Sequence, residues 1–317
     1  MKAKRPSRQR QYIHLGPITS ATINITSPQS QSPRDADADD DNIIMASYLP
    51  NSNASHKRLP DRPEPSLWQK VANRPPWKQH FVATLGEFVG TFQFLFFGNT
   101  VHLMVINLGT QTPTPKLLEI VYIGYGYGFS LLVNVWAFYR ISGGLFNPAI
   151  TLGLCLAGKL PWIRLIFYPP AQLIGGILAG ALCKALFPGD FSGTITSVAP
   201  GVSKIQGLFG EMFLTAFLMF TILMLAGEKS RTSFVAPVGI GLALFVAQLA
   251  GVFFTGGSLN PARSLGSSAA AASFPAEHWI YWAGPAMGAI LAACFFRLLK
   301  VLDYEEANPG QDAKSEV

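Results

Sequence analysis

Six long apolar segments follow one another in this sequence, and no other feature limits its possible folds as strongly. They are residues 81–106, 118–138, 162–186, 207–226, 234–254 and 279–299. Each has about 20 residues or more, and a helix that rises about 1.5 Å per residue needs about that length to cross ~30 Å of hydrocarbon. Because lipid offers the backbone no hydrogen-bond partners, we predict six transmembrane helices and no open strands.

Charged residues are scarce in the region that holds these segments. Lys, Arg, Asp and Glu account for 17 of the 220 residues from 81 to 300, about 8%, whereas an ordinary soluble domain contains ~25%. This composition argues against a soluble globular enzyme, which needs more charges to cover its surface. The sequence has no nucleophile–base pattern, metal-ligand spacing or nucleic-acid module. We therefore expect no catalytic or metal site, no cofactor and no nucleic-acid partner.

The polar ends and the loop charges predict the orientation of the chain. Residues 1–80 are rich in Ser, Pro, Asn, Asp and Arg and are expected to form a disordered tail, and residues 301–317 a short second tail. Lys and Arg are more numerous in the loops on one side of the predicted helices, which is expected to be the cytosolic side. Six spans place both termini there. The expected location is the plasma membrane, and an internal membrane is the alternative.

The second half of the region from 81 to 300 repeats the first. Glu87 and Glu211 each follow a glycine in the first span of a half, and a threonine lies four residues after each glutamate. The loops at 142–151 and 255–264 both contain Gly-Gly-x-x-Asn-Pro-Ala. Each copy has three spans, an odd number, so the second copy must enter the membrane from the opposite side, as an inverted repeat. The two copies are residues 81–187 and 207–300.

Two Asn-Pro-Ala motifs, Asn147-Pro148-Ala149 and Asn260-Pro261-Ala262, are predicted to begin two short helices. Proline is favoured at the first helical position because its missing N–H would be unpaired there, and asparagine is among the best N-caps. The stretches that follow, to about Leu156 and Ala270, are too short to span a membrane. We expect two re-entrant half-helices that meet at the midplane. Their positive N-terminal ends and the asparagine amides would orient water, interrupt proton hopping and oppose cations.

At these residues the sequence resembles the aquaporin family of major intrinsic proteins, and fungal members in particular. Further matches are Gly-Glu-Phe around Glu87, Ala-Gln at Gln172, Glu211, and the string at 278–285. The resemblance covers about residues 81–300. It implies an all-α membrane protein with six transmembrane helices and two re-entrant half-helices, a pore in each subunit and a homotetramer in the lipid bilayer.

The resemblance also assigns the narrow outer filter of the pore, by counting from each motif asparagine. The four positions are Tyr127, Gln248, Gly257 and Arg263. Water-selective members usually place histidine where this chain has Gln248, so the filter is expected to be wider than that of a strict water pore. Glycerol-conducting members usually carry aspartate directly after the arginine, where this chain has Ser264.

Backbone carbonyls and two carboxylates complete the expected path. The resemblance assigns pore carbonyls to Gly143, Gly144, Leu145, Gly256, Gly257 and Ser258. Glu87 and Glu211 lie inside apolar spans, where an ionisable residue is by default functional. Our preferred interpretation is that each carboxylate accepts hydrogen bonds from the backbone N–H groups of the re-entrant loop in its own half. The alternative is a proton site of a coupled transporter.

The sequence therefore predicts a passive water channel that excludes protons and ions. One alternative is a broader channel that also passes glycerol, hydrogen peroxide or other small neutral solutes. Another, from a different class, is a proton-coupled secondary transporter that uses Glu87 or Glu211.

Overall fold

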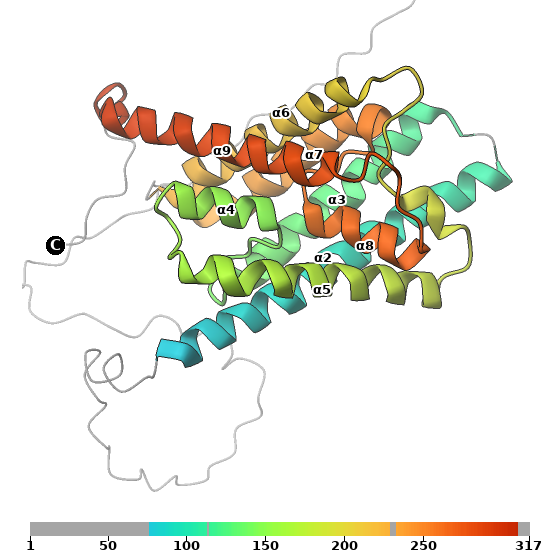
Figure 1. Ribbon diagram of the computed structural model, residues 1–317, viewed down its shortest axis with the longest axis horizontal. Helices are drawn as coiled ribbons and strands as arrows, with labels where there is room; N and C mark the ends of the chain where they lie inside the picture. Colours follow the sequence, from blue (N-terminus) through green and yellow to red (C-terminus); the bar gives the residue numbers. More distant parts are fainter. Residues whose placement is uncertain (1–75, 113, 229–232, 310–317) are drawn as a thin grey trace, which may run out of the picture. The chain divides into compact units, whose positions relative to one another are not determined.

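The computed structural model describes residues 76–112, 114–228 and 233–309 (Figure 1). All of them belong to the unit of the chain formed by residues 65–317. The disordered tail expected at residues 1–80 lies outside the described residues up to residue 75, and so does the end of the second tail, residues 310–317.

Six long helices occupy the positions that the apolar segments predict. They are α2 (Pro76–Gln111), α3 (Lys116–Phe138), α5 (Ile163–Leu186), α6 (Lys204–Ile222), α7 (Ala236–Thr255) and α9 (Ile280–Val301). With the short turns that extend α6 and α7, all six are long and apolar enough to cross a membrane. No strand occurs among the described residues. The all-α membrane fold is thus confirmed.

Three helix ends have local features that hydropathy does not predict: a proline start, a capping box and a π-helical turn. The first helix begins at Pro76, before the expected boundary at residue 81, because proline needs no N–H partner at a helix start. Ser203 and Gln206 form a capping box at the start of α6. The last turn of that span, Leu223–Gly227, is a π-helix.

Both halves of the chain build the same arrangement around two short helices, α4 (Pro148–Leu156) and α8 (Pro261–Ala271). In the first half α2 packs on α3 and α5, and in the second half α6 packs on α7 and α9. The halves meet along α3 and α7, and each short helix packs on a long helix of the other half, α4 on α9 and α8 on α5. Figure 1 shows α4 and α8 end to end between α5 and α9.

Glycines on α5 let the short helix α8 approach closely. A Cβ atom on Gly176 would lie 2.5 Å from the carbonyl oxygen of Ala262, and one on Gly180 would lie 2.7 Å from that of Gly266. Real Cβ atoms do not come so close to a backbone oxygen, so any side chain here would push the two helices apart. Small residues serve this purpose in membrane helix packing.

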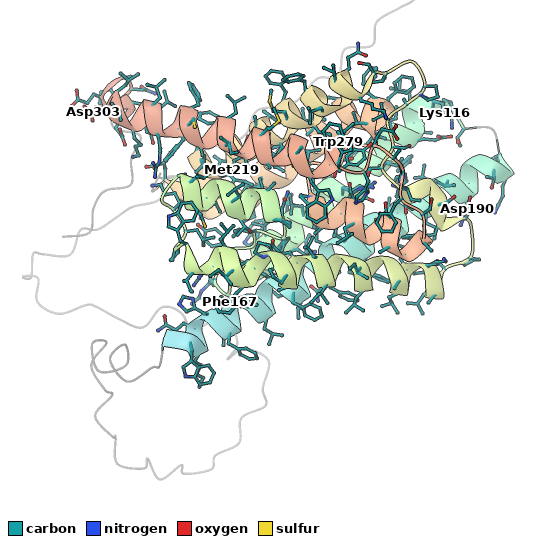
Figure 2. The ribbon with its side chains drawn as sticks, in the orientation of Figure 1. Lys116, Phe167, Asp190, Met219, Trp279 and Asp303 are labelled. Atoms are coloured by element: carbon teal, nitrogen blue, oxygen red, sulfur yellow. The ribbon has the colours of Figure 1, made fainter. Side chains whose placement is uncertain are left out.

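The outward faces of the long helices are apolar, whereas charged side chains gather at their ends. Phe97, Phe213 and Phe253 each expose more than half of their surface, as suits contact with lipid rather than water. Figure 2 shows the side chains of Lys116 and Asp190 at one end of the helices and that of Asp303 at the other.

Candidate functional site

The two motif asparagines cap the short helices and join them to each other. Asn147 Oδ1 accepts from Ala149 N at 2.9 Å, and Asn260 Oδ1 accepts from Ala262 N at 2.9 Å. Each side-chain amide then donates across the junction, Asn147 Nδ2 to the Leu259 carbonyl at 2.7 Å and Asn260 Nδ2 to the Phe146 carbonyl at 2.9 Å. An asparagine NH₂ group has two hydrogens, so one donor on each amide is left for a ligand.

The loop before each asparagine bends through a left-handed residue. Phe146 has φ of 52° and Leu259 has φ of 53°, and neither is a glycine. Such conformations cost about 1–3 kcal/mol each and persist only where the surroundings enforce them. Both side chains are fully buried, so packing holds the two bends in place.

Two buried carboxylates hold these loops from behind. Glu87 accepts from Leu145 N at 3.1 Å and from Phe146 N at 2.7 Å. Glu211 accepts in the same way from Ser258 N at 2.9 Å and from Leu259 N at 2.8 Å. Each carboxylate therefore bonds to the loop of its own half, in the geometry that our preferred interpretation of the sequence predicts. Since the N–H groups turn toward the carboxylates, the carbonyls of the same loops are free to face the other way.

A cavity of about 430 Å³ passes between the two motifs. It contacts Tyr127 near the middle of α3 and Tyr139 just after its end, which are about 18 Å apart at 1.5 Å per residue. Its wall includes Tyr139, Arg140, Lys159, Arg164, Gly143, Gly144, Leu145, Asn147, Ser258, Asn260, Tyr127, Gln248 and Arg263. Of the six carbonyl residues predicted, this wall includes Gly143, Gly144, Leu145 and Ser258. The Gly257 carbonyl accepts from Nε2 of Gln248, another residue of the wall, at 2.7 Å.

The four residues assigned to the outer filter form two contacting pairs, Gln248 with Gly257 and Arg263 with Tyr127. Gln248 contacts Gly257 through the bond just described. The Arg263 guanidinium lies 5.0 Å from the centre of the Tyr127 ring and donates through Nη1 to the Thr194 carbonyl at 2.8 Å. Arg263 is only 2% exposed, so a buried cation lies in the cavity wall beside Tyr127.

Two residues of α2 at this end were missed by the sequence analysis. The Tyr127 hydroxyl donates to Asn99 Oδ1 at 2.8 Å. His102 Nδ1 lies 3.4 Å from Arg263 Nη2 and 3.5 Å from the Tyr127 hydroxyl. The available signal was the spacing of Asn99 and His102, which puts two polar side chains on one face of an apolar helix.

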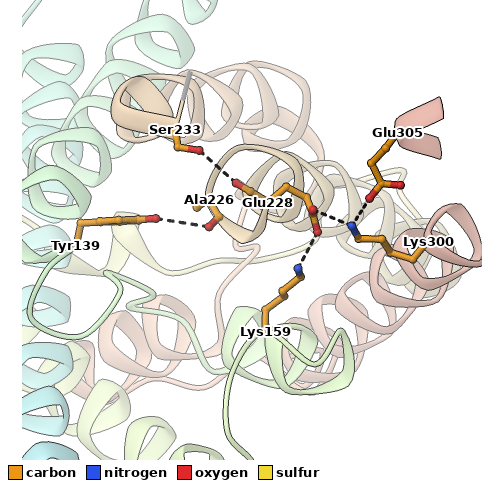
Figure 3. A network of polar contacts seen from close by, with 7 residues as sticks. All are labelled: Tyr139, Lys159, Ala226, Glu228, Ser233, Lys300 and Glu305. Atoms are coloured by element: carbon orange, nitrogen blue, oxygen red, sulfur yellow. Dashed lines mark hydrogen bonds and ion pairs between the residues drawn. The ribbon is translucent and has the colours of Figure 1, made fainter. Parts of the chain in front are cut away.

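Figure 3 shows a network of ion pairs that includes Lys159, a residue that lines the opposite end of the cavity. Glu228 pairs with Lys159 at 2.7 Å and with Lys300 at 2.8 Å, and Lys300 also pairs with Glu305. The Tyr139 hydroxyl donates to the Ala226 carbonyl at 3.5 Å. Partial burial raises the pKa of the Glu228 carboxyl, but its two lysine partners outweigh burial and hold that pKa below its ordinary value. This network ties the end of the fourth span to the turn after α4 and to the end of α9.

The described part of the chain also bears on metal binding. No group of three or more His, Cys, Asp and Glu side chains there has such an arrangement.

Comparison with known proteins places this geometry in a family. The family described as "Major intrinsic protein" matches residues 76–296. A protein named "Probable aquaporin-3" from Gibberella zeae is 53% identical over 270 residues, 84% of this chain and 93% of its own length. "Aquaporin-7" from Botryotinia fuckeliana is 53% identical over 252 residues, 78% of this chain and 55% of its own length.

A solved structure has the same fold. The X-ray structure of the aquaglyceroporin from Plasmodium falciparum superposes with a TM-score of 0.62 at 21% identity, covering 71% of this chain and 99% of that protein. The family match, the fungal relatives and the six membrane-length helices agree with the resemblance seen in the sequence. The chain belongs to the major intrinsic protein family, the aquaporins, and is an integral membrane channel protein of that family.

Proposed function

We propose that this chain is a passive water channel that excludes protons and ions. The observation that carries the proposal is a cavity whose wall contains both motif asparagines and the buried Arg263. Its wall combines apolar side chains such as Leu131 and Ile150 with a few fixed polar groups. Water can exchange hydrogen bonds with such groups one molecule at a time, without a tight binding site that would delay its exit.

Proton exclusion follows from how the two asparagines are held. Each amide donates one N–H to a loop carbonyl of the other half, and this bond fixes the direction of its second N–H. A water between them turns its oxygen toward both amides and its hydrogens away from the centre, which breaks a chain of proton transfers. The N-terminal ends of α4 and α8 add partial positive charge at the same place and oppose cations.

A broader channel that also conducts glycerol or hydrogen peroxide is the alternative function. The geometry that favours a wider filter is the bond from Gln248 to the Gly257 carbonyl, since it draws the glutamine amide toward the wall of the pore. Ser264, in contrast, is fully buried and bonds to Thr196 at 2.7 Å and Ser258 at 2.6 Å. It occupies the position where glycerol-conducting relatives usually have aspartate, and this difference favours water.

A proton-coupled transporter is the less favoured function. Its candidate proton sites, Glu87 and Glu211, each accept two backbone N–H bonds. A carboxylate that holds a loop in this way would break those contacts on each cycle of protonation, so its geometry suits a fixed support better than a shuttle.

We further propose the topology and assembly that the family implies. Both termini lie in the cytosol, because Arg140, Lys159 and Arg164 surround one end of the cavity and basic loops stay on the cytosolic side. The channel domain comprises residues 81–300 and forms a homotetramer, with the plasma membrane as its location.

Stopped-flow light scattering on proteoliposomes tests the proposed function. Vesicles with the full chain should shrink much faster than empty vesicles under an impermeant osmolyte, with a low activation energy and no dependence on a pH gradient. Rapid re-swelling in glycerol would favour the broader channel. Slow, gradient-dependent flux would favour the coupled transporter, and shrinkage no faster than that of empty vesicles would refute a water channel.

A further inference from the structure

At the outer end of the cavity, an imidazole that none of the four assigned filter positions supplies lies behind the lining residues Arg263 and Tyr127. His102 comes from α2, is 7% exposed, and lies between the Arg263 guanidinium and the Tyr127 hydroxyl. Its ring meets the Tyr127 ring edge-on, with centroids 6.0 Å apart and planes at 82°. His102 therefore touches two of the assigned filter residues at once.

The donors and acceptors around His102 show which group donates to its Nδ1 atom. Arginine can only donate, so His102 accepts from Arg263 through an unprotonated Nδ1 and carries its proton on Nε2. The Tyr127 hydroxyl already donates its one hydrogen to Asn99 at 2.8 Å. This leaves Arg263 Nη2 as the donor to Nδ1, at 3.4 Å.

The guanidinium is thus fixed from three sides. Nη1 donates to the Thr194 carbonyl, Nη2 faces His102 Nδ1, and Cζ lies over the Tyr127 ring. Removing the imidazole acceptor would leave a buried cationic donor without its partner on the α2 side, and the long arginine side chain could then swing.

Gln248 does not replace the imidazole. Its Nε2 is committed to the Gly257 carbonyl, and its Oε1 has no hydrogen-bond partner among the described residues. Water-selective relatives usually have a histidine at the α7 position of the filter, where this chain has Gln248. Here the histidine beside Arg263 is His102, which belongs to α2.

We infer that His102 is a positioning residue of the outer filter, which sets solute selectivity by holding Arg263 in place through Nδ1. This inference rests on the proposed function, because it assumes that Arg263 faces a conducted solute. It places a supporting side chain behind the four assigned filter positions and gives α2 a part in selectivity.

Two substitutions separate the acceptor from the bulk of the ring. His102→Phe keeps a ring but has no acceptor. His102→Asn loses the ring but can place Oδ1 where Nδ1 stood, because both atoms are attached to Cγ. Thr100→Val is the matched control on α2, since the Thr100 hydroxyl bonds to the Phe96 carbonyl of its own helix at 2.8 Å and not to the filter.

The measured quantity is the ratio of glycerol to water permeability in proteoliposomes at equal protein density. We expect His102→Phe to raise this ratio about tenfold, which corresponds to about 1.4 kcal/mol in the barrier. His102→Asn and Thr100→Val should stay within about twofold of the wild-type ratio, a difference of less than half a kcal/mol. The Arg263→Ala channel should show a raised ratio as well, and adding His102→Phe to it should change nothing further, because residues that act through one contact are not additive.

The outcomes distinguish this inference from the function on which it rests. If the wild-type chain conducts water but His102→Phe keeps its ratio, or the double variant exceeds Arg263→Ala by the full factor of His102→Phe, the positioning role is refuted and the channel stands. If His102→Asn shifts the ratio as far as His102→Phe does, the ring and not the acceptor is responsible, which also refutes it. A wild-type chain that conducts neither water nor glycerol overturns both.

Discussion

Replacing Glu87 by glutamine tests whether the buried carboxylates support the loops or carry protons. Glu87 Oε2 accepts from Phe146 N and from Gln172 Nε2, both at 2.7 Å, and Oε1 accepts from Leu145 N at 3.1 Å. A glutamine keeps the first two bonds if its oxygen takes the Oε2 position. Its NH₂ group then faces the Leu145 N–H, so two donors oppose each other.

The expected cost follows from these three contacts. A buried N–H without a partner costs about 1–3 kcal/mol, and each of the other two bonds loses about 1 kcal/mol when its acceptor becomes neutral. Relief of the desolvation of a buried charge returns part of this sum. We expect Glu87→Gln to destabilise the channel by about 2–4 kcal/mol, which lowers the melting temperature by about 5–15 °C for a domain of this size.

The assay is thermal unfolding in detergent, followed by water permeability in proteoliposomes. Glu119→Gln is the matched control, because Glu119 forms a partly exposed ion pair with Lys116 at 2.8 Å, and such pairs contribute less than about 1 kcal/mol. If Glu87→Gln melts at the wild-type temperature, the carboxylate does not hold the loop. If the variant is stable but loses only gradient-driven transport, the coupled-transporter interpretation is correct instead.

Three further substitutions test other parts of the structure. Gly176→Ala should prevent α8 from docking on α5 and reduce the yield of folded channel in size-exclusion chromatography. The control Gly210→Ala should fold normally, because the nearest atom to a new Cβ there is 3.8 Å away. Equal yields of the two variants would contradict the close packing of α8 on α5. Asn260→Asp keeps the cap acceptor but replaces the pore-facing donor by a negative charge, so cation conductance in planar bilayers should rise, and an ion-tight variant would argue against the proposed midplane barrier. Glu228→Gln should lower the melting temperature at neutral pH, because the folded-state pKa of Glu228 lies below the ordinary value of 4.5 and the ionised carboxylate pairs with two lysines. The difference in melting temperature between wild type and variant should shrink as pH falls below 4.5 toward the folded-state pKa. A difference that does not depend on pH would refute the electrostatic origin.

The approximate positions of the six spans and the starting points of the two short helices could be predicted from the sequence, whereas the start of α2 at Pro76 could not. The six spans follow from apolar length, and the two short helices start at Pro148 and Pro261 as predicted because capping depends on neighbours in the chain. The bonds from Glu87 and Glu211 to the loops were expected from the repeat and the family resemblance, since two carboxylates at matching positions call for matching partners.

Only the tertiary structure decided how the filter is assembled. His102 and Arg263 are separated by 161 positions in the chain. The spacing of Asn99 and His102 indicates a polar face on α2, but it does not indicate that this face meets Arg263. The direction of the Gln248 amide depends on its bond to the Gly257 carbonyl, nine positions away in the chain. Helix length and caps are local properties of a sequence, whereas the contacts of a buried side chain depend on helix packing and on the rotamer that the packed core permits.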